Sequence, residues 1–205
     1  VEERVELQER LVEALTLDPF NDRFVLAAGA VSELQPDGGG HLTWRSSVSA
    51  RLAGRPFGAI QLDVSPRAHE LERTDTVPLT NSLAFAEIEV PSIEIIDVNR
   101  HAAEKLHAMT RDYGGRENTR VRDLLDVVIL IEHELLDRDA LSSAVRDVWT
   151  ERNGSPPPLA LPALPDSWPN TYERLVAEHD LTAKTFPSAL DAVTSLWASL
   201  NIEES

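Results

Sequence analysis

Two helical patterns decide how this chain folds: DVNRHAAEKLHAMTR at residues 97–111 and RVRDLLDVVILI at residues 120–131. In both, apolar residues recur at the spacing of one face of an α-helix. The Gly114-Gly115 pair between them predicts a left-handed stop for the first helix. We therefore expect two helices that pack against each other through apolar stripes. The stripes are formed by Val98, Ala102, Leu106 and Met109 in the first helix and by Val121, Leu124, Leu125, Val128 and Ile131 in the second.

Charged residues beside these stripes are more numerous than a buried helix pair requires. Lys105 lies beside the first stripe, and Asp123 and Asp126 share a neighbouring face of the second helix. A lysine that faces paired aspartates suits a phosphate group, a metal ion, or both. The simpler alternative is a solvated face with ion pairs inside one helix, such as Arg122 with Asp126. The basic residues expected around this cluster are Arg100, Arg111, Arg116, Arg120 and Arg122.

The composition is that of an ordinary globular protein, with 42% hydrophobic and 26% charged residues in 205 positions. This length fits one large domain or two small ones. No stretch approaches the roughly 20 apolar residues of a membrane-spanning helix. The absence of cysteine excludes disulfides and thiolate metal sites and fits a reducing cytoplasm. Because the net charge is −16, any contact with nucleic acid must be local.

Lysine is rare in this chain. Of its 19 basic residues only Lys105 and Lys184 are lysine. A lysine in the middle of a helix, in a chain that otherwise uses arginine, hints that a compact ammonium group is needed there.

The N-terminal part predicts one helix and a small sheet. An amphipathic helix is expected over residues 2–16, followed by a short buried strand from Phe24 to Val31. Apolar and polar residues alternate over 42–52, a Gly-Arg-Pro turn follows, and 57–64 forms the second strand of a β-hairpin. This part of the chain is therefore expected to be mainly antiparallel sheet.

Two features of this sheet have a possible chemical role. Three glycines at 38–40 invite comparison with a phosphate-binding loop, but no helix start with Lys-Ser or Lys-Thr follows, so we expect a hairpin loop. Asp63 stands late in its strand, where a carboxylate can serve as a metal ligand. The alternative for Asp63 is a strand-end charge that reaches solvent.

The rest of the chain predicts a helical bundle. Residues 66–92 are polar and irregular, Ile93 to Ile96 make a last short strand, and Asp97 can cap the helix that follows. Further helices are expected at 139–152, 169–178 and 188–200, with a proline-rich connector before the second of these. The expected fold class is α+β: a helix-flanked sheet in residues 1–97, followed by a helical domain in residues 98–205.

Other polar motifs have simpler explanations. His101 and His107 are six residues apart, so they do not share a helical face, and we expect solvated or packed histidines. Asp137-Arg138-Asp139 has the Asp-x-Asp form of a metal site, but it falls in a turn between helices, where capping explains both acids. No Gly-x-Ser-x-Gly motif of a serine hydrolase occurs.

Several motifs together resemble the nucleotidyltransferases of the AbiEii/AbiGii toxin family. They are IQLDV at 60–64, AEKLHAMTR at 103–111 and TRVRDLLDVVIL at 119–130. The RLAGRPF segment at 51–57 and the proline-rich stretch before Trp168 add to the resemblance. The coupled EKLHA and RxRDLxD elements are its most specific part.

This resemblance implies a polymerase-β-like core followed by a helical domain, and transfer of a nucleotide from a nucleoside triphosphate. Several such proteins are toxins that modify the acceptor end of tRNA, and an antitoxin is a possible partner. By resemblance, Asp63 would bind Mg²⁺ or Mn²⁺, Lys105 would hold the triphosphate, and Asp126 would complete the catalytic set. Asp123 would pair with Asp126. Arg120 and Arg122 would contact phosphates.

One family motif is missing. The family signature begins with a Gly-Ser turn and then an Asp-x-Asp on a strand, and nothing before Asp63 supplies them. We expect this chain to be an N-terminally truncated form of a longer transferase, inactive alone. The alternative is a catalytically dead pseudo-transferase that binds nucleotide or a protein partner, and a third reading is a purely structural domain. Either functional reading predicts that Asp63, Lys105 and Asp126 converge on one cleft.

Overall fold

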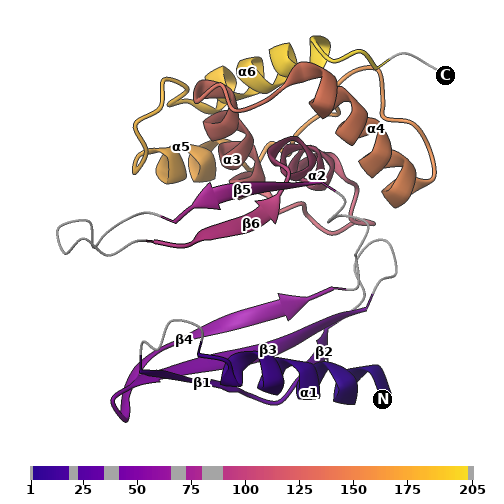
Figure 1. The fold of residues 1–205 in the computed structure, drawn as a ribbon. Coiled ribbons are helices and arrows are strands. Elements are labelled where there is room, and N and C mark those ends of the chain that lie inside the picture. The colour runs from indigo at the N-terminus through magenta and orange to yellow at the C-terminus, as the bar shows by residue number, and fades with distance from the viewer. Residues whose placement is uncertain (1, 19–22, 35–41, 66–72, 80–89, 203–205) are drawn as a thin grey trace. The chain divides into compact units, whose positions relative to one another are not determined.

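The computed structural model describes residues 2–18, 23–34, 42–65, 73–79 and 90–202. The chain divides into two compact units, residues 1–68 and residues 69–205 (Figure 1). Helices and antiparallel strands make up both units, so the predicted α+β class is confirmed. The predicted boundary at residue 97 separates a transferase core from a helical domain. Compact units do not test that division, so it stays a prediction.

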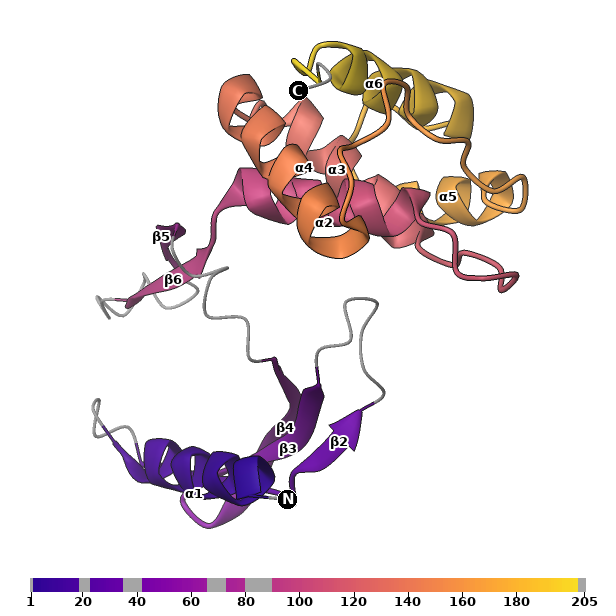
Figure 2. The same ribbon diagram turned by 90° about the vertical axis from the view of Figure 1, so that its right-hand side faces the viewer.

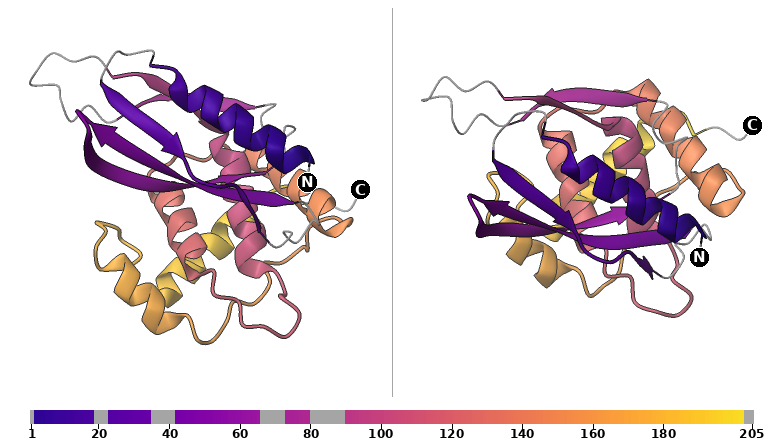
Figure 3. Two further views of the ribbon diagram at one scale, coloured as in Figure 1. Left: turned by 90° about the horizontal axis from the view of Figure 1, so that it is seen from below. Right: turned by 60° about the horizontal axis from the view of Figure 1, so that its bottom comes forward.

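The first unit is a small antiparallel sheet with one helix. The central strand β3 pairs with β1 and β2 along one edge and with β4 along the other. The helix α1 packs along β1 (Figure 3). The elements are α1 (Glu2–Thr16), β1 (Phe24–Ala28), β2 (Ser32–Leu34), β3 (Thr43–Leu52) and β4 (Arg55–Val64).

The hairpin of β3 and β4 confirms the predicted one, with an earlier turn. Leu52 pairs with Arg55, so the loop consists of Ala53 and Gly54 alone. Both have positive φ, 48° and 78°, as a two-residue hairpin turn that matches strand twist requires. Gly54 adopts this conformation without the penalty that a side chain carries.

The single buried strand predicted from Phe24 to Val31 is wrong. The strand breaks after Ala28, and the five residues of β1 are exposed or half-buried. Gly29 donates its N–H to the carbonyl of Ser47 at 2.7 Å, and a Cβ atom at Gly29 would lie only 2.5 Å from the Ser47 hydroxyl oxygen. This close approach of the backbone to β3 divides the strand into β1 and β2. The predicted glycine loop at 36–40 lies outside the described residues.

The second unit consists of a two-stranded hairpin and five helices, over the residues that the structure describes. The expectation that residues 66–92 are irregular is wrong at 74–78, because this segment pairs with the predicted isoleucine strand. The elements are β5 (Thr74–Pro78), β6 (Ser92–Ile96), α2 (Val98–Thr110), α3 (Val121–Glu132), α4 (Arg138–Asn153), α5 (Pro169–Val176) and α6 (Phe186–Ala198).

The core of this unit forms around α2, which packs against both α3 and α4 (Figure 2). The predicted stripes are confirmed for most positions: they are buried in one cluster to which α4, α5 and α6 also contribute. Two tryptophans of this cluster and the buried His107 pack edge to face, with His107 on Trp149 at 4.9 Å and Trp149 on Trp197 at 5.4 Å between centroids. His107 is therefore a packed histidine, as predicted. The fully buried stripe residues are Ala102, Leu106, Met109, Leu124 and Val128.

The two ends of α2 differ from each other in how well the sequence predicts them. At its start the Asp97 carboxylate accepts the N–H of Arg100 at 2.8 Å, which confirms the predicted cap. Its end is not the predicted glycine stop. The helix finishes at Thr110 with an extended Arg111, before Gly114 and its neighbour. No helix among the described residues is long and apolar enough to cross a membrane.

Candidate functional site: a lysine between two aspartates beside a basic loop

The candidate site lies where α2 meets α3. The Lys105 ammonium donates to the Asp126 carboxylate at 2.6 Å and approaches Asp123 at 3.4 Å. Lys105 and Asp123 are mostly covered, with side chains 15% and 14% exposed, whereas that of Asp126 is 42% exposed. The apolar stripes set this geometry, because they fix α2 against α3 and leave these three residues at the rim of the contact.

The charges of this cluster are balanced. The Arg120 guanidinium lies 4.0 Å from the Asp123 carboxylate, so two cations face two carboxylates. An ammonium has three N–H donors, and the two aspartates take two of them. Asp126, the more exposed partner, stands where a ligand from solvent would reach Lys105. The cluster can therefore exchange one carboxylate for a phosphate oxygen.

The two ion pairs of Lys105 cross from α2 to α3, whereas the Arg120–Asp123 pair lies within the start of α3. The pair between Arg122 and Asp126, which was the example given for a solvated face, does not occur among the described residues. His101, one turn before Lys105, belongs to the same surroundings. Burial, and next the charge of Lys105, lower the pKa of His101 below its ordinary value, against the opposing effect of Asp126 and Asp123.

Arg100 does not belong to the predicted basic group around this cluster. Its guanidinium binds Glu104 at 2.9 Å and Glu151 at 2.5 Å, and Arg152 binds Glu104 at 2.9 Å. Burial opposes the charged form of Arg100, but its bonds to Glu151 and Glu104 together raise its pKa. This network joins α2 to α4 and has a structural role. The prediction for Arg100 fails because its partner Glu151 lies far along the chain, where sequence spacing does not reveal it.

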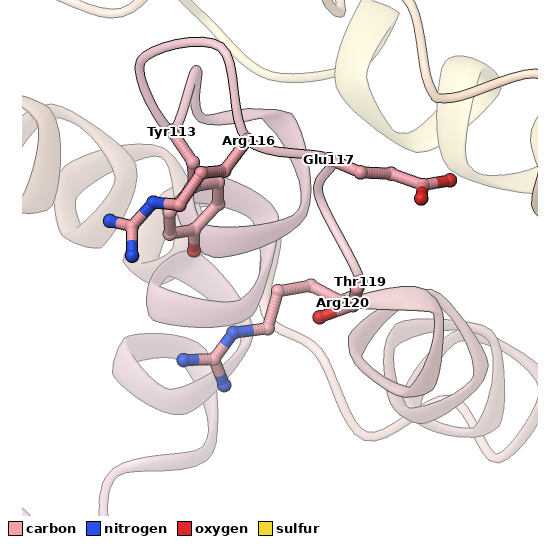
Figure 4. Close-up of a pocket in the computed structure, with 5 residues that line it drawn as sticks. All are labelled: Tyr113, Arg116, Glu117, Thr119 and Arg120. Carbon is pink, nitrogen blue, oxygen red and sulfur yellow. The ribbon is translucent and has the colours of Figure 1, made fainter.

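The loop between α2 and α3 forms an open basic pocket of about 280 Å³ next to the cluster. Figure 4 shows that the guanidinium groups of Arg116 and Arg120 point to the same side, with the ring of Tyr113 beside them. The carboxylate of Glu117 points away from both. We call this the loop pocket. Its lining residues are Tyr113, Arg116, Glu117, Thr119 and Arg120.

Asn118 holds the loop pocket in shape, and sequence reasoning does not single it out. Its side-chain amide nitrogen lies 3.0–3.2 Å from the carbonyl oxygens of Ala108, Met109 and Arg111 and shares its two N–H donors among them, at the open end of α2. Its side-chain oxygen accepts the N–H of Arg120 at 2.9 Å. The only signal in the sequence is an asparagine shortly after a helix, which is common in loops.

Two further bonds secure this loop. The indole N–H of buried Trp168 donates to the Asn118 carbonyl at 2.8 Å. The Tyr113 hydroxyl donates to the Ala108 carbonyl at 3.2 Å, and the Arg111 guanidinium lies 5.4 Å from the centre of the Tyr113 ring. The aromatic ring is thus held in position at the pocket wall.

Asp63 belongs to the first unit and binds Arg45 through both carboxylate oxygens. Arg45 Nε and Nη2 each donate to one of them at 2.7 Å. The hydrogen bond from Arg45 is the main reason that the pKa of Asp63 lies below its ordinary value. The predicted convergence of Asp63 with Lys105 and Asp126 stays a prediction.

The described residues do not fit a divalent metal ion by themselves. They include no group of three histidine, cysteine or acidic side chains placed to hold one. Both oxygens of Asp63 are taken by Arg45, and Oδ2 of Asp126 is taken by Lys105. In the Asp-x-Asp at 137–139, Asp137 caps α4 through the N–H of Ala140 at 2.8 Å, as predicted.

The family model of the nucleotidyl transferase AbiEii toxin, from type IV toxin–antitoxin systems, matches residues 2–194. This chain belongs to the AbiEii family. The match confirms the resemblance drawn from the motifs and covers Asp63, the Lys105 cluster and the loop pocket. AbiEii membership assigns the chain to the toxin–antitoxin nucleotidyltransferases, which implies a nucleotide substrate and an antitoxin partner. No curated protein matches the chain.

Proposed function

We propose that this AbiEii-family chain binds the triphosphate of a nucleoside triphosphate at Lys105, and that the nucleotidyltransferase to which it belongs transfers the nucleotide to tRNA. The observation that supports it most directly is the position of the Lys105 ammonium, 2.6 Å from Asp126 and 3.4 Å from Asp123 at the rim of the helix contact. A compact cation held in this way can bind a phosphate oxygen without prior rearrangement of the backbone. Arg120 and Arg122 contribute further positive charge from the start of α3.

The exposure of Asp126 and the charge of Lys105 allow a phosphate oxygen to replace the Asp126 carboxylate at Lys105. Asp126 is 42% exposed, so its carboxylate can release Lys105 and stay next to it while the better covered Asp123 keeps Lys105 in place. A phosphate oxygen then takes the position of Asp126 and makes a charge-assisted hydrogen bond of comparable strength. Binding of triphosphate therefore leaves the carboxylate of Asp126 unpaired beside the reacting groups.

The transfer step needs few protein groups. The acceptor hydroxyl oxygen bonds to the α-phosphorus, the bond from that phosphorus to the bridging oxygen breaks, and pyrophosphate leaves with the electron pair. We assign to Lys105 the stabilisation of the charge that develops on pyrophosphate. We assign the hydroxyl proton to the freed carboxylate of Asp126.

Mg²⁺ or Mn²⁺, with Asp63 as a ligand, stays a prediction from the family resemblance. Asp63 would first have to release Arg45, so no step of the proposal is assigned to the ion. We place the reaction in the cytoplasm, where nucleoside triphosphates and tRNA are present, and an antitoxin would oppose it there.

The test compares the two lysines of the chain. Lys105→Ala should weaken binding of nucleoside triphosphates at least tenfold, about 1.4 kcal/mol, in equilibrium titrations. Lys184→Ala is the matched control, because Lys184 is exposed and its ammonium donates to the backbone carbonyl of His179 in another loop. Unchanged nucleotide binding by Lys105→Ala would overturn the proposal.

A second assay measures transfer of radiolabelled nucleotide to purified tRNA. Label that enters tRNA with the wild type and not with Lys105→Ala supports the complete proposal. Triphosphate binding without any transfer is the result that an inactive truncated form and a pseudo-transferase share, and it would remove transfer by this chain from the proposal. Label that enters another acceptor would remove tRNA from the proposal.

A further inference from the structure

We propose that the loop pocket binds a nucleotide, with its phosphate between Arg116 and Arg120 and its base against Tyr113. This site is distinct from Lys105 and adjoins it, because Arg120 lines the pocket and also lies 4.0 Å from Asp123. The inference rests on the proposed function, since it adds a second phosphate contact to the same reaction. The phosphate belongs either to the bound triphosphate or to the strand of an RNA acceptor.

The first argument is the direction of the side chains. The guanidinium groups of Arg116 and Arg120 point to one side of the loop, and Glu117 points away from them (Figure 4). A planar guanidinium donates two parallel hydrogen bonds to a phosphate, so two of them on one side define a site for an anion. Both arginines are exposed and can reach a ligand from solvent.

The second argument is the aromatic wall. The Tyr113 ring lines the same pocket and is held by its hydroxyl bond to the Ala108 carbonyl. A fixed ring next to a cationic groove is the arrangement by which proteins hold single nucleotides, through stacking of the base and pairing of the phosphate. The pocket therefore selects a nucleotide over an inorganic anion.

The third argument is preorganisation. Asn118 ties the loop to the end of α2 and to the backbone of Arg120, and Trp168 anchors Asn118 from the core. The carboxylate of Asp112 accepts the N–H of Gly114 at 2.8 Å, so it serves the turn of the loop. A ligand would therefore meet a loop that needs little ordering, which favours affinity.

The charge of the protein limits the length of this ligand. A chain with net charge −16 repels a long duplex, and only a local basic area can accept nucleic acid. The proposed ligand is therefore one nucleotide or a short single strand, and not a double helix.

The experiment compares Arg116→Gln with Arg174→Gln, an equal loss of charge at an exposed residue of α5. Two probes are titrated by fluorescence anisotropy: a labelled ATP and a labelled single-stranded RNA of five nucleotides. We expect Arg116→Gln to weaken the binding of one probe about three- to tenfold. The slope of log affinity against log salt concentration for that probe should fall by about one. Arg116→Lys should restore part of the loss.

The probe that is affected identifies the source of the phosphate. A loss for ATP assigns the loop pocket to the triphosphate, and a loss for RNA alone assigns it to the acceptor strand. Equal binding by Arg116→Gln and Arg174→Gln for both probes overturns the inference, as does a wild type that binds neither. A wild type that binds neither probe also overturns the proposed function, whereas failure of the proposed function alone appears as normal ATP binding by Lys105→Ala.

Discussion

The Nζ atom of Lys105 lies 2.6 Å from Oδ2 of Asp126 and thereby joins α2 to α3 outside their apolar contact. The pair is not needed to hold the helices together, because fully buried residues such as Leu106 and Leu124 already do so. Its unequal exposure, 15% for Lys105 and 42% for Asp126, leaves one partner able to move. The relationship therefore suits a site at which a ligand replaces a carboxylate.

Asp126→Asn should separate binding from transfer. The neutral amide no longer competes for Lys105, so nucleoside triphosphate should bind at least as tightly as to the wild type. Transfer should fall at least tenfold, because no carboxylate remains to accept the proton, and stability should change by less than about 1 kcal/mol. Titration and transfer assays measure the two effects.

Asp191→Asn, at an exposed position of α6, is the charge-matched control for this variant. If Asp126→Asn binds nucleotide as poorly as Lys105→Ala does, Asp126 serves only to position the lysine.

Asp63→Asn tests the carboxylate of the first unit. The Arg45–Asp63 pair is exposed, 40% and 45% for the two side chains, so its loss should leave the midpoint of urea unfolding unchanged. If Asp63 acts in nucleotide transfer, Asp63→Asn should lose transfer activity. Arg45→Gln removes the same ion pair and keeps the carboxylate, so it should retain transfer. Equal activity of Asp63→Asn and wild type would remove Asp63 from the site.

Asn118→Ala should destabilise the helical unit by about 2 to 3 kcal/mol, because the carbonyls at the end of α2 lose their partner. Asn118→Asp should be at least as unstable, since its carboxylate would face the same carbonyl oxygens. Urea unfolding gives both values, with Asn201→Ala at an exposed position as the control. An unfolding free energy equal to that of wild type would show that the loop does not depend on this amide.

Glu132 should make stability depend on pH. Burial alone would raise its pKa, but the N–H groups of Thr182 and Ala183, bonded at 2.7 and 2.8 Å, lower it below the ordinary value of 4.5. Because the pKa of Glu132 is lower in the folded state, its ionised form stabilises the protein at a pH above the pKa of the unfolded state. This stabilisation is lost as the pH falls through the pKa of the folded state. The free energy of unfolding of the wild type should therefore exceed that of Glu132→Gln by the largest amount above pH 4.5, and by less below it.

Denaturant titrations at several pH values measure this difference, with Glu134→Gln, an exposed acid nearby, as the control. A difference between wild type and Glu132→Gln that stays constant with pH would mean that ionisation of Glu132 is not linked to folding.

The helices of the second unit are largely predictable from the sequence, because the residues that signal a helix and its ends lie within or next to that helix. Apolar residues such as Ala102 and Leu124 recur at helical spacing and are buried. Asp97 and Asp137 cap the helices that they precede. Gly154 ends α4 in the left-handed conformation, with φ of 66°.

The errors come from contacts between distant residues. Gly114 and Gly115 have positive φ, as expected, but α2 ends earlier because the Asn118 amide takes its last carbonyls. Arg100 turns to Glu151, 51 residues away, instead of toward Lys105. The segment 74–78 has one large apolar residue and a proline, so its strand depends on pairing with β6.

The most direct test of phosphate binding at Lys105 uses NMR, because the chain contains only Lys105 and Lys184 as lysines. A protein labelled with ¹³C and ¹⁵N in lysine alone gives two sets of side-chain signals, which a Lys184→Arg variant assigns. We predict that added ATP shifts the signals of Lys105 and leaves those of Lys184 unchanged, whereas adenosine shifts neither. Lys105 signals that do not move at saturating ATP would contradict the account.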